Sequence, residues 1–228
     1  MPVTSPPSAM DVGVITADYW KAEAALSRAV RVEARRAIRA WKRGRRMKLE
    51  VTPKMVDALN ALYHAGVRHA RREAKALGVK IPATYATMVT VPLRLHKILR
   101  RLIANLSGMA LRLERDAKLG TDDGLVRGSL NVGAVVQAVG VAGALDGLLP
   151  QTFTSGLADT YEGAADAFDG WQYSAELDGG TCNACEPLDG ETYATLDEAY
   201  AVLPDFGPNP DCEGGWRCRC RLVPIGPA

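Results

Sequence analysis

Residues 181–193 read TCNACEPLDGETY, and residues 212–220 read CEGGWRCRC. These two stretches hold all five cysteines of the chain, namely Cys182, Cys185, Cys212, Cys218 and Cys220. Thiols separated by two residues in a turn, with others close behind, can converge on one ion without a large core around them. The pattern therefore predicts a small C-terminal module folded around a structural zinc ion.

The spacing leaves open which of the five thiols stays out of a four-coordinate zinc site. Cys182 and Cys185 are the firmest candidates. If Cys218 and Cys220 lie on a strand, their side chains point to one face and both can turn toward the first pair. Cys212 lies in a loop of Gly, Pro and Asn, close enough in sequence to join them.

Other uses of the thiols are also open. Disulfides are the main alternative in an oxidising environment, although five thiols cannot all pair within one chain. Redox catalysis by the Cys-x-x-Cys pair lacks the βαβ pattern that accompanies it, and free thiols remain a further alternative. A catalytic zinc is disfavoured, because such sites usually carry histidine ligands and no histidine lies beyond His96.

Charge divides the chain into two unlike halves. The net charge of +2 hides 24 Lys and Arg against 9 Asp and Glu in residues 1–120, and 4 against 17 in residues 121–228. Such polarity predicts a basic half that meets nucleic acid or an acidic protein surface, and an acidic half with a different neighbour. A solvated surface without a partner is the alternative.

Residues 14–47 show the period of a long helix. One apolar stripe recurs every three or four residues, formed by Leu26, Val30, Ala34, Ala37 and Trp41. The opposite face is basic and consists of Arg28, Arg31, Arg35, Arg39, Lys42 and Arg46. Like charges in a row weaken an isolated helix, so we expect this face to bind double-stranded DNA or an acidic protein.

Three further helical segments follow. Thr52-Pro53 is a helix start and Gly78 a stop, and a third apolar stripe runs from about Val91 to Gly120. Residues 131–168 indicate two helical pieces divided at Pro150. Short connections between long amphipathic helices favour a bundle of antiparallel neighbours.

The pattern changes at residue 170. Residues 171–177, 191–193 and 218–223 are typical of strands, and residues 195–203 of a short helix stopped by Pro204. We therefore predict an α+β protein with a disordered segment over residues 1–13, a helical domain over 14–169 and a mixed cysteine module over 170–228.

The chain shows no sign of catalysis or membrane insertion. We find no phosphate-binding loop, no G-x-S-x-G motif and no nucleophile with its base, so we expect no enzyme and no catalytic residue. His64, His69 and His96 are interpreted as surface or packing residues. The most apolar stretch, residues 132–149, is broken by Gln137 and Asp146, and no N-terminal signal sequence precedes the helices, which favours a cytoplasmic site of synthesis.

Residues 171–223 resemble the phage head morphogenesis family, the Mu F-like minor head proteins. The matches in order are Leu177-Asp178, Thr181-Cys182, Cys185, Leu188-Asp189-Gly190 and Cys218-Arg219-Cys220. The family carries a histidine before the Cys-Arg-Cys, and Cys212 stands in that region here. A cysteine preserves metal binding, so the resemblance extends the metal role to Cys212.

The resemblance implies a non-enzymatic minor capsid protein of the virion. Such a protein is assembled in the bacterial host cytoplasm, joins the head with portal and capsid proteins at the portal vertex, and acts in DNA packaging or delivery. A zinc-ribbon regulator that reads nucleic acid is the alternative, weakened because the cysteine module is acidic. A head maturation protease or nuclease is a third hypothesis, which lacks a catalytic triad or a two-metal cluster. The oligomeric state stays open.

Overall fold

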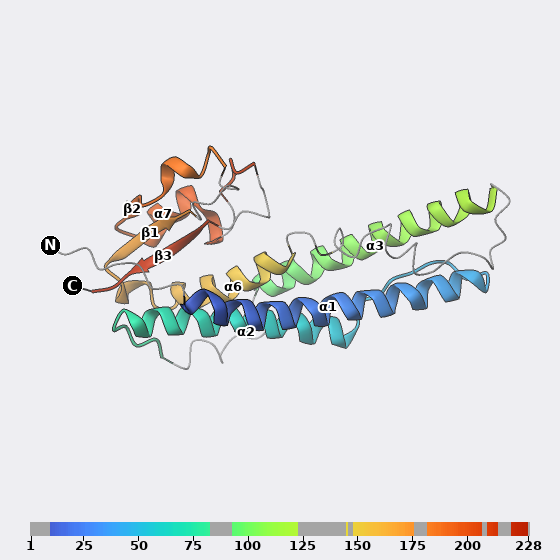
Figure 1. Ribbon diagram of the computed structural model, residues 1–228, viewed down its shortest axis with the longest axis horizontal. Coiled ribbons are helices and arrows are strands. Elements are labelled where there is room, and N and C mark those ends of the chain that lie inside the picture. Colours follow the sequence, from blue (N-terminus) through green and yellow to red (C-terminus); the bar gives the residue numbers. More distant parts are fainter. Residues whose placement is uncertain are drawn as a thin grey trace.

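The computed structural model describes residues 10–82, 93–122, 145, 148–175, 182–206, 209–213 and 220–227. These residues are mostly helical and include one small antiparallel sheet, so the predicted α+β class is confirmed. Long helices run side by side along the molecule, and the sheet lies over one end of them (Figure 1).

Helix α1 (Met10–Lys42) buries the predicted apolar stripe. Its members Leu26, Val30, Ala34, Ala37 and Trp41 are all buried in the helical core. The helix begins before the predicted residue 14 and ends before the predicted residue 47. It ends where it does because Gly44 takes a positive φ of 80°, a conformation that glycine adopts without steric cost.

Helix α2 (Pro53–Ala76) has the predicted boundaries. Pro53 stands in the first turn, where its missing N–H is not needed, and Gly78 follows the last turn with a φ of 78°. Helix α3 (Leu93–Asp122) buries Ile98 and Leu102 as predicted. Local rules of helix start, period and stop therefore account for these segments.

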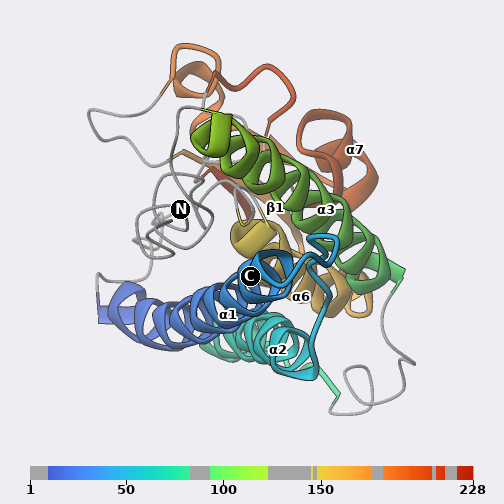
Figure 2. The ribbon, with the colours of Figure 1, turned by 90° about the vertical axis from the view of Figure 1, so that its right-hand side faces the viewer.

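Helix α6 (Leu148–Glu162) packs most extensively on α2 and also contacts α3 (Figure 2). The predicted break at Pro150 is wrong, because α6 passes through this residue. Pro150 lies in the first turn of α6, where a backbone N–H has no helical acceptor, so the proline is tolerated. Most of the other predicted piece, residues 131–144, lies outside the described residues.

The sheet contains β1 (Gly170–Ser174), β2 (Thr192–Tyr193) and β3 (Arg221–Ile225) in the order β2-β1-β3, all antiparallel. Helix α7 (Leu196–Val202) follows β2, with Thr195 and Glu198 forming a capping box. Short 3-10 helices span Ala165–Ala167, Glu186–Leu188 and Pro204–Phe206. The last strand begins at Arg221, later than predicted, so Cys220 precedes it.

The sheet and the helices share a hydrophobic core. Trp171 and Tyr173 of β1 pack with Ala70 and Ala74 of α2, and the Trp171 ring meets the Tyr161 ring of α6 edge-on at a centroid distance of 5.5 Å. Aromatic pairs of this kind add about 1 kcal/mol beyond the area that they bury. The cysteine module is therefore packed against α2 and α6. None of the helices in the described ranges combines the length and apolar content of a membrane span.

Candidate metal centre and basic surface

Three thiols of the cysteine module converge. The sulfur atoms of Cys182, Cys185 and Cys212 all lie within 4.8 Å of one another. A turn brings the first two together, because the Cys185 backbone N–H donates to the Cys182 carbonyl at 2.9 Å and the Glu186 N–H donates to the same oxygen at 3.1 Å. The predicted Cys-x-x-Cys turn is thus present and brings two donors to one place.

Asn209 holds Cys212 against this turn. Its side-chain amide is buried and donates to the Ala184 carbonyl at 3.4 Å and to the Cys185 sulfur at 3.8 Å. Its backbone carbonyl accepts from the Cys212 N–H at 2.9 Å. Sequence reasoning missed Asn209, although the Pro-Asn-Pro run around it signals a turn.

The distances allow the three thiols to share a metal ion. The Cys182 and Cys212 sulfurs are 3.5 Å apart, whereas a disulfide joins them at about 2.05 Å. Four thiolates bound tetrahedrally at about 2.3 Å from zinc lie about 3.8 Å from one another. Among the described cysteines, Cys182, Cys185, Cys212 and Cys220 are all free thiols. The three converging thiols can therefore hold one metal ion.

The remaining two cysteines stand differently. Cys220 is outside the three-thiol group, but it interacts with Cys185 and lies directly before β3. Cys218 lies outside the described residues. The expectation that both would point to one face of a strand is not met for Cys220, which precedes the strand.

Neighbouring groups shift the thiol pKa values in opposite directions. The hydrogen bond with Cys185 is the largest of the effects that lower the pKa of Cys182 to about 7, and Cys212 adds to it. Burial raises the pKa of Cys185, and the neighbouring thiols Cys182, Cys220 and Cys212 raise it further. Cys182 is therefore the thiol of this pair that more readily becomes the thiolate that a metal requires.

Tyr173 of β1 points its hydroxyl at the same place. The side chain is completely buried, and its hydroxyl lies beside the Cys185 and Cys220 sulfurs without a well-aligned hydrogen bond to any described group. Burial raises its pKa first, and Cys185 and Cys220 raise it further, so the hydroxyl keeps its proton. An O–H group beside metal-bound thiolates is a suitable hydrogen-bond donor to them. The unsatisfied hydroxyl thus fits a metal centre formed by these sulfurs.

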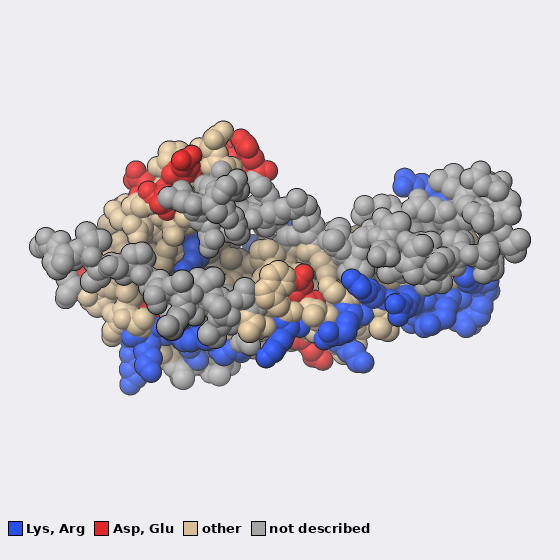
Figure 3. All heavy atoms as spheres, viewed as in Figure 1, with Lys and Arg blue, Asp and Glu red and all other residues tan. Residues whose placement is uncertain are grey.

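The predicted basic face is exposed on α1. Arg28, Arg31, Arg35 and Arg39 are solvent-exposed, and Lys42 is partly buried in the last turn. Arg46 is exposed but lies beyond the end of α1, so the helical geometry predicted for it is wrong. On the face in Figure 3, Lys and Arg gather along the lower edge and at the end farthest from the cysteine module, whereas Asp and Glu gather over that module. The charge polarity of the sequence is therefore also a polarity in space.

A buried polar cluster joins β3 to α2. Arg221 Nη1 donates to Glu73 Oε1 at 2.7 Å, His69 Nε2 lies 3.2 Å from Glu73 Oε2, and the Tyr161 hydroxyl donates to the same carboxylate. Burial alone would raise the pKa of Glu73, but these hydrogen bonds and charges lower it to about 2. His69 is thus a packing residue as predicted, His64 is exposed, and the side chain of His96 is outside the description.

Comparisons of the chain with models of protein families, with curated proteins and with solved structures find no match.

Proposed function

We propose that the protein is a bacteriophage minor head protein that acts in head morphogenesis at the portal vertex. One observation supports this most: the cysteines that match the ordered motif of that family include two of the three converging thiols, Cys182 and Cys185. The third, Cys212, occupies the region where the family carries a histidine. In this proposal the centre stabilises the module, and the protein performs no reaction.

We assign zinc to the centre, with Cys182, Cys185 and Cys212 as ligands and Cys220 as the fourth. An all-thiolate, four-coordinate donor set is typical of structural zinc. The ion would tie the turn at residues 182–188 and the loop at residues 209–213 to the start of β3. Metal binding would add to the folding free energy that the module gains from its packing on α2 and α6. Cys218 is then the spare thiol.

Elemental analysis of the purified chain with thiol counting under denaturing conditions tests the zinc assignment. We expect one zinc per chain and five reduced thiols. Cys182→Ser should lose the zinc, and Cys218→Ser should keep it as the matched control. A metal-free chain with fewer than five thiols would show that disulfides hold the module together and would remove the zinc centre.

Sedimentation of purified heads from the phage that encodes the chain tests whether the protein is a head component. The chain should sediment with heads and portal complexes, and its copy number should be small beside that of the major capsid protein. Its absence from heads at every stage of assembly would refute the proposal. Sequence-selective binding by the full chain to one duplex among many would instead support the zinc-ribbon regulator.

A further inference from the structure

We propose that the second half of α1 and the segment that follows it form one cationic surface, two rows wide, that binds the phosphate backbone of double-stranded DNA without reading its sequence. If the proposed function is correct, this DNA is the genome packaged in the head. The second row consists of residues 43–48, which follow α1 and run back along it. A buried carboxylate, Glu33, holds that row in place.

The first row lies on α1. Arg28, Arg31, Arg35 and Arg39 are exposed and spaced by three or four residues, which spreads them over roughly 16 Å of helix axis. No carboxylate pairs with any of them in the part of the chain that the structure describes. Their mutual repulsion weakens the helix, and a polyanion laid along the row would offset it.

The second row follows the turn at Gly44. Arg43, Arg45 and Arg46 are exposed, and they too have no carboxylate partner among the described residues. Beyond them the chain is extended and alternates, since Met47 and Leu49 are buried in the helical core whereas Lys48 between them is exposed. The two buried side chains keep this segment beside the helices instead of letting it extend into solvent.

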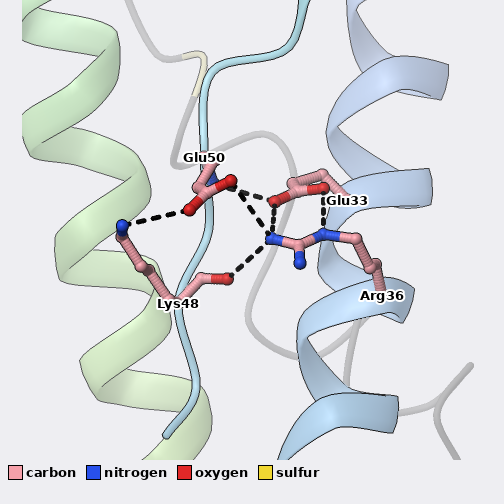
Figure 4. Close-up of polar contacts among 4 residues, drawn as sticks. All are labelled: Glu33, Arg36, Lys48 and Glu50. Atoms are coloured by element: carbon pink, nitrogen blue, oxygen red, sulfur yellow. Dashed lines mark hydrogen bonds and ion pairs between the residues drawn. The ribbon is translucent and has the colours of Figure 1, made fainter.

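Glu33 is the latch between the two rows (Figure 4). Its buried carboxylate accepts from Arg36 Nε at 2.8 Å, from Arg36 Nη2 at 2.6 Å and from the Glu50 backbone N–H at 2.8 Å. Arg36 also reaches the Lys48 carbonyl at 3.4 Å, and Lys48 pairs with Glu50 at 3.0 Å. Helix and segment are thus joined by charge-assisted hydrogen bonds, which are stronger than neutral ones.

The latch also leaves the outer surface positive. Residues 28–50 contain ten Lys and Arg but two carboxylates, Glu33 and Glu50. Both carboxylates bind at the seam, where they meet Arg36 and Lys48. Burial alone would raise the pKa of Glu33, yet the Arg36 and Glu50 hydrogen bonds lower it, so the latch stays charged at neutral pH. The outward arginines of both rows therefore face solvent without a neutralising acid.

Duplex DNA suits this surface better than an acidic protein does. It offers a regular negative charge every 1.7 Å or so along its axis, whereas protein surfaces mix both signs. Residues 28–50 contain no Asn or Gln, the side chains that bind adenine edges with two hydrogen bonds. Their one aromatic residue, Trp41, is buried and cannot stack on an unpaired base. The remaining arginines and lysines can all contact phosphates, and a regular row of cations fits the repeating backbone of any duplex.

Fluorescence anisotropy with the full chain and a mixed-sequence duplex of about 30 base pairs, between about 50 and 200 mM salt, tests the two rows. Replacing Arg28, Arg31 and Arg35 with Gln should flatten the slope of log K against log salt by about 2.7, since each phosphate contact contributes about 0.9. Replacing Arg43, Arg45 and Arg46 with Gln should flatten it equally. A slope that the second triple variant leaves unchanged would overturn the two-row surface.

Glu33→Ala tests the latch through the sign of its effect. Loss of a carboxylate adds positive charge, so charge alone predicts tighter binding. Loss of the latch predicts binding at least about tenfold weaker at low salt and a flatter slope, because the second row loses its place. Asp57→Ala is the matched control, since Asp57 is an exposed carboxylate on α2 and its loss changes the net charge equally. It should leave binding unchanged or slightly tighter.

Two further measurements complete the test. Circular dichroism checks the fold, and Glu33→Gln, which keeps the size of the side chain, should show the same weakening if the alanine variant does not fold. Tighter binding by either Glu33 variant would overturn the latch. Displacement of the duplex by polyglutamate at equal charge concentration would make the partner an acidic protein. If the chain is found in heads but does not bind DNA, the cationic surface is overturned and the proposed function stands. If the chain binds DNA but is absent from heads, the cationic surface stands and the proposed function is overturned.

Discussion

The crossing of α2 and α6 depends on two glycines that face each other. A Cβ atom on Gly66 would lie 2.1 Å from the Phe153 carbonyl oxygen, and a Cβ on Gly156 would lie 2.1 Å from the Tyr63 carbonyl oxygen. Real Cβ atoms essentially never approach another atom closer than 3.0 Å. Gly66→Ala must therefore push the two helix backbones apart, because neither obstructing atom is the end of a flexible side chain.

The cost can be estimated from this distance. The backbones must separate by about 1 Å, and overpacking of this kind costs about 1–3 kcal/mol. We expect the upper end of that range, because α2 and α6 form the most extensive contact between helices in the described part of the chain. Alanine regains about 1 kcal/mol of helix propensity over glycine. The net loss of unfolding free energy should thus be about 2 kcal/mol.

Urea unfolding followed by far-UV circular dichroism measures this loss. Gly108→Ala is the matched control, because Gly108 lies within α3 and a Cβ there would meet nothing within 4 Å. It should raise the unfolding free energy by up to about 1 kcal/mol. The Gly66→Ala and Gly156→Ala losses should add incompletely, since either one opens the same crossing. A gain in stability for Gly66→Ala, as for the control, would refute the close approach.

Three further predictions concern the cysteine end of the molecule. The Glu73 carboxylate contributes up to about 3 kcal/mol to the free energy of unfolding above about pH 4.5, and this contribution is lost as the pH falls through the Glu73 pKa of about 2. Glu73→Gln should remove the contribution. In an acid titration, the unfolding free energy of the variant should therefore fall less than that of wild type across this pH range. Tyr173→Phe should weaken zinc binding by about tenfold or more in a competition assay with a chelator, because the hydroxyl lies beside Cys185 and Cys220. An unchanged zinc affinity would mean that the hydroxyl does not contact the centre. Thr195→Ala should cost about 1 kcal/mol and speed hydrogen exchange in α7, because it removes the cap that Glu198 completes; unchanged exchange would show that packing alone holds this helix.

The helical part could be predicted well where local rules decide. The stripe of α1, the proline at the start of α2 and the glycine after its end all express a period or a backbone preference within a few residues. The errors also have local causes. Gly44 ends α1 within a run whose basic period continues to Arg46. Pro150 is harmless because it lies in a first turn. The effect of either residue type therefore depends on where the helix begins and ends.

The presence of a cysteine cluster could be predicted from the sequence, but not which of the thiols come together. Sequence alone indicated thiols gathered in an acidic module, but spacing cannot say that Cys212 comes to the Cys182 turn, since the loop between them has many paths. Asn209 makes that choice through hydrogen bonds. Tyr173 gave no sequence signal, because a tyrosine in a strand is normally a packing residue.

The sequence by itself determined what depends on neighbours along the chain, namely the helices, the strands, the separation of charge and the presence of clustered thiols. Tertiary structure decided the pairings across long separations. Arg221 meets Glu73 across 148 residues, and Glu50 returns to Glu33 across 17. Such pairs carry no periodic signal, because a buried carboxylate needs charge-assisted hydrogen bonds to offset the cost of leaving water, and only the folded chain brings their donors near.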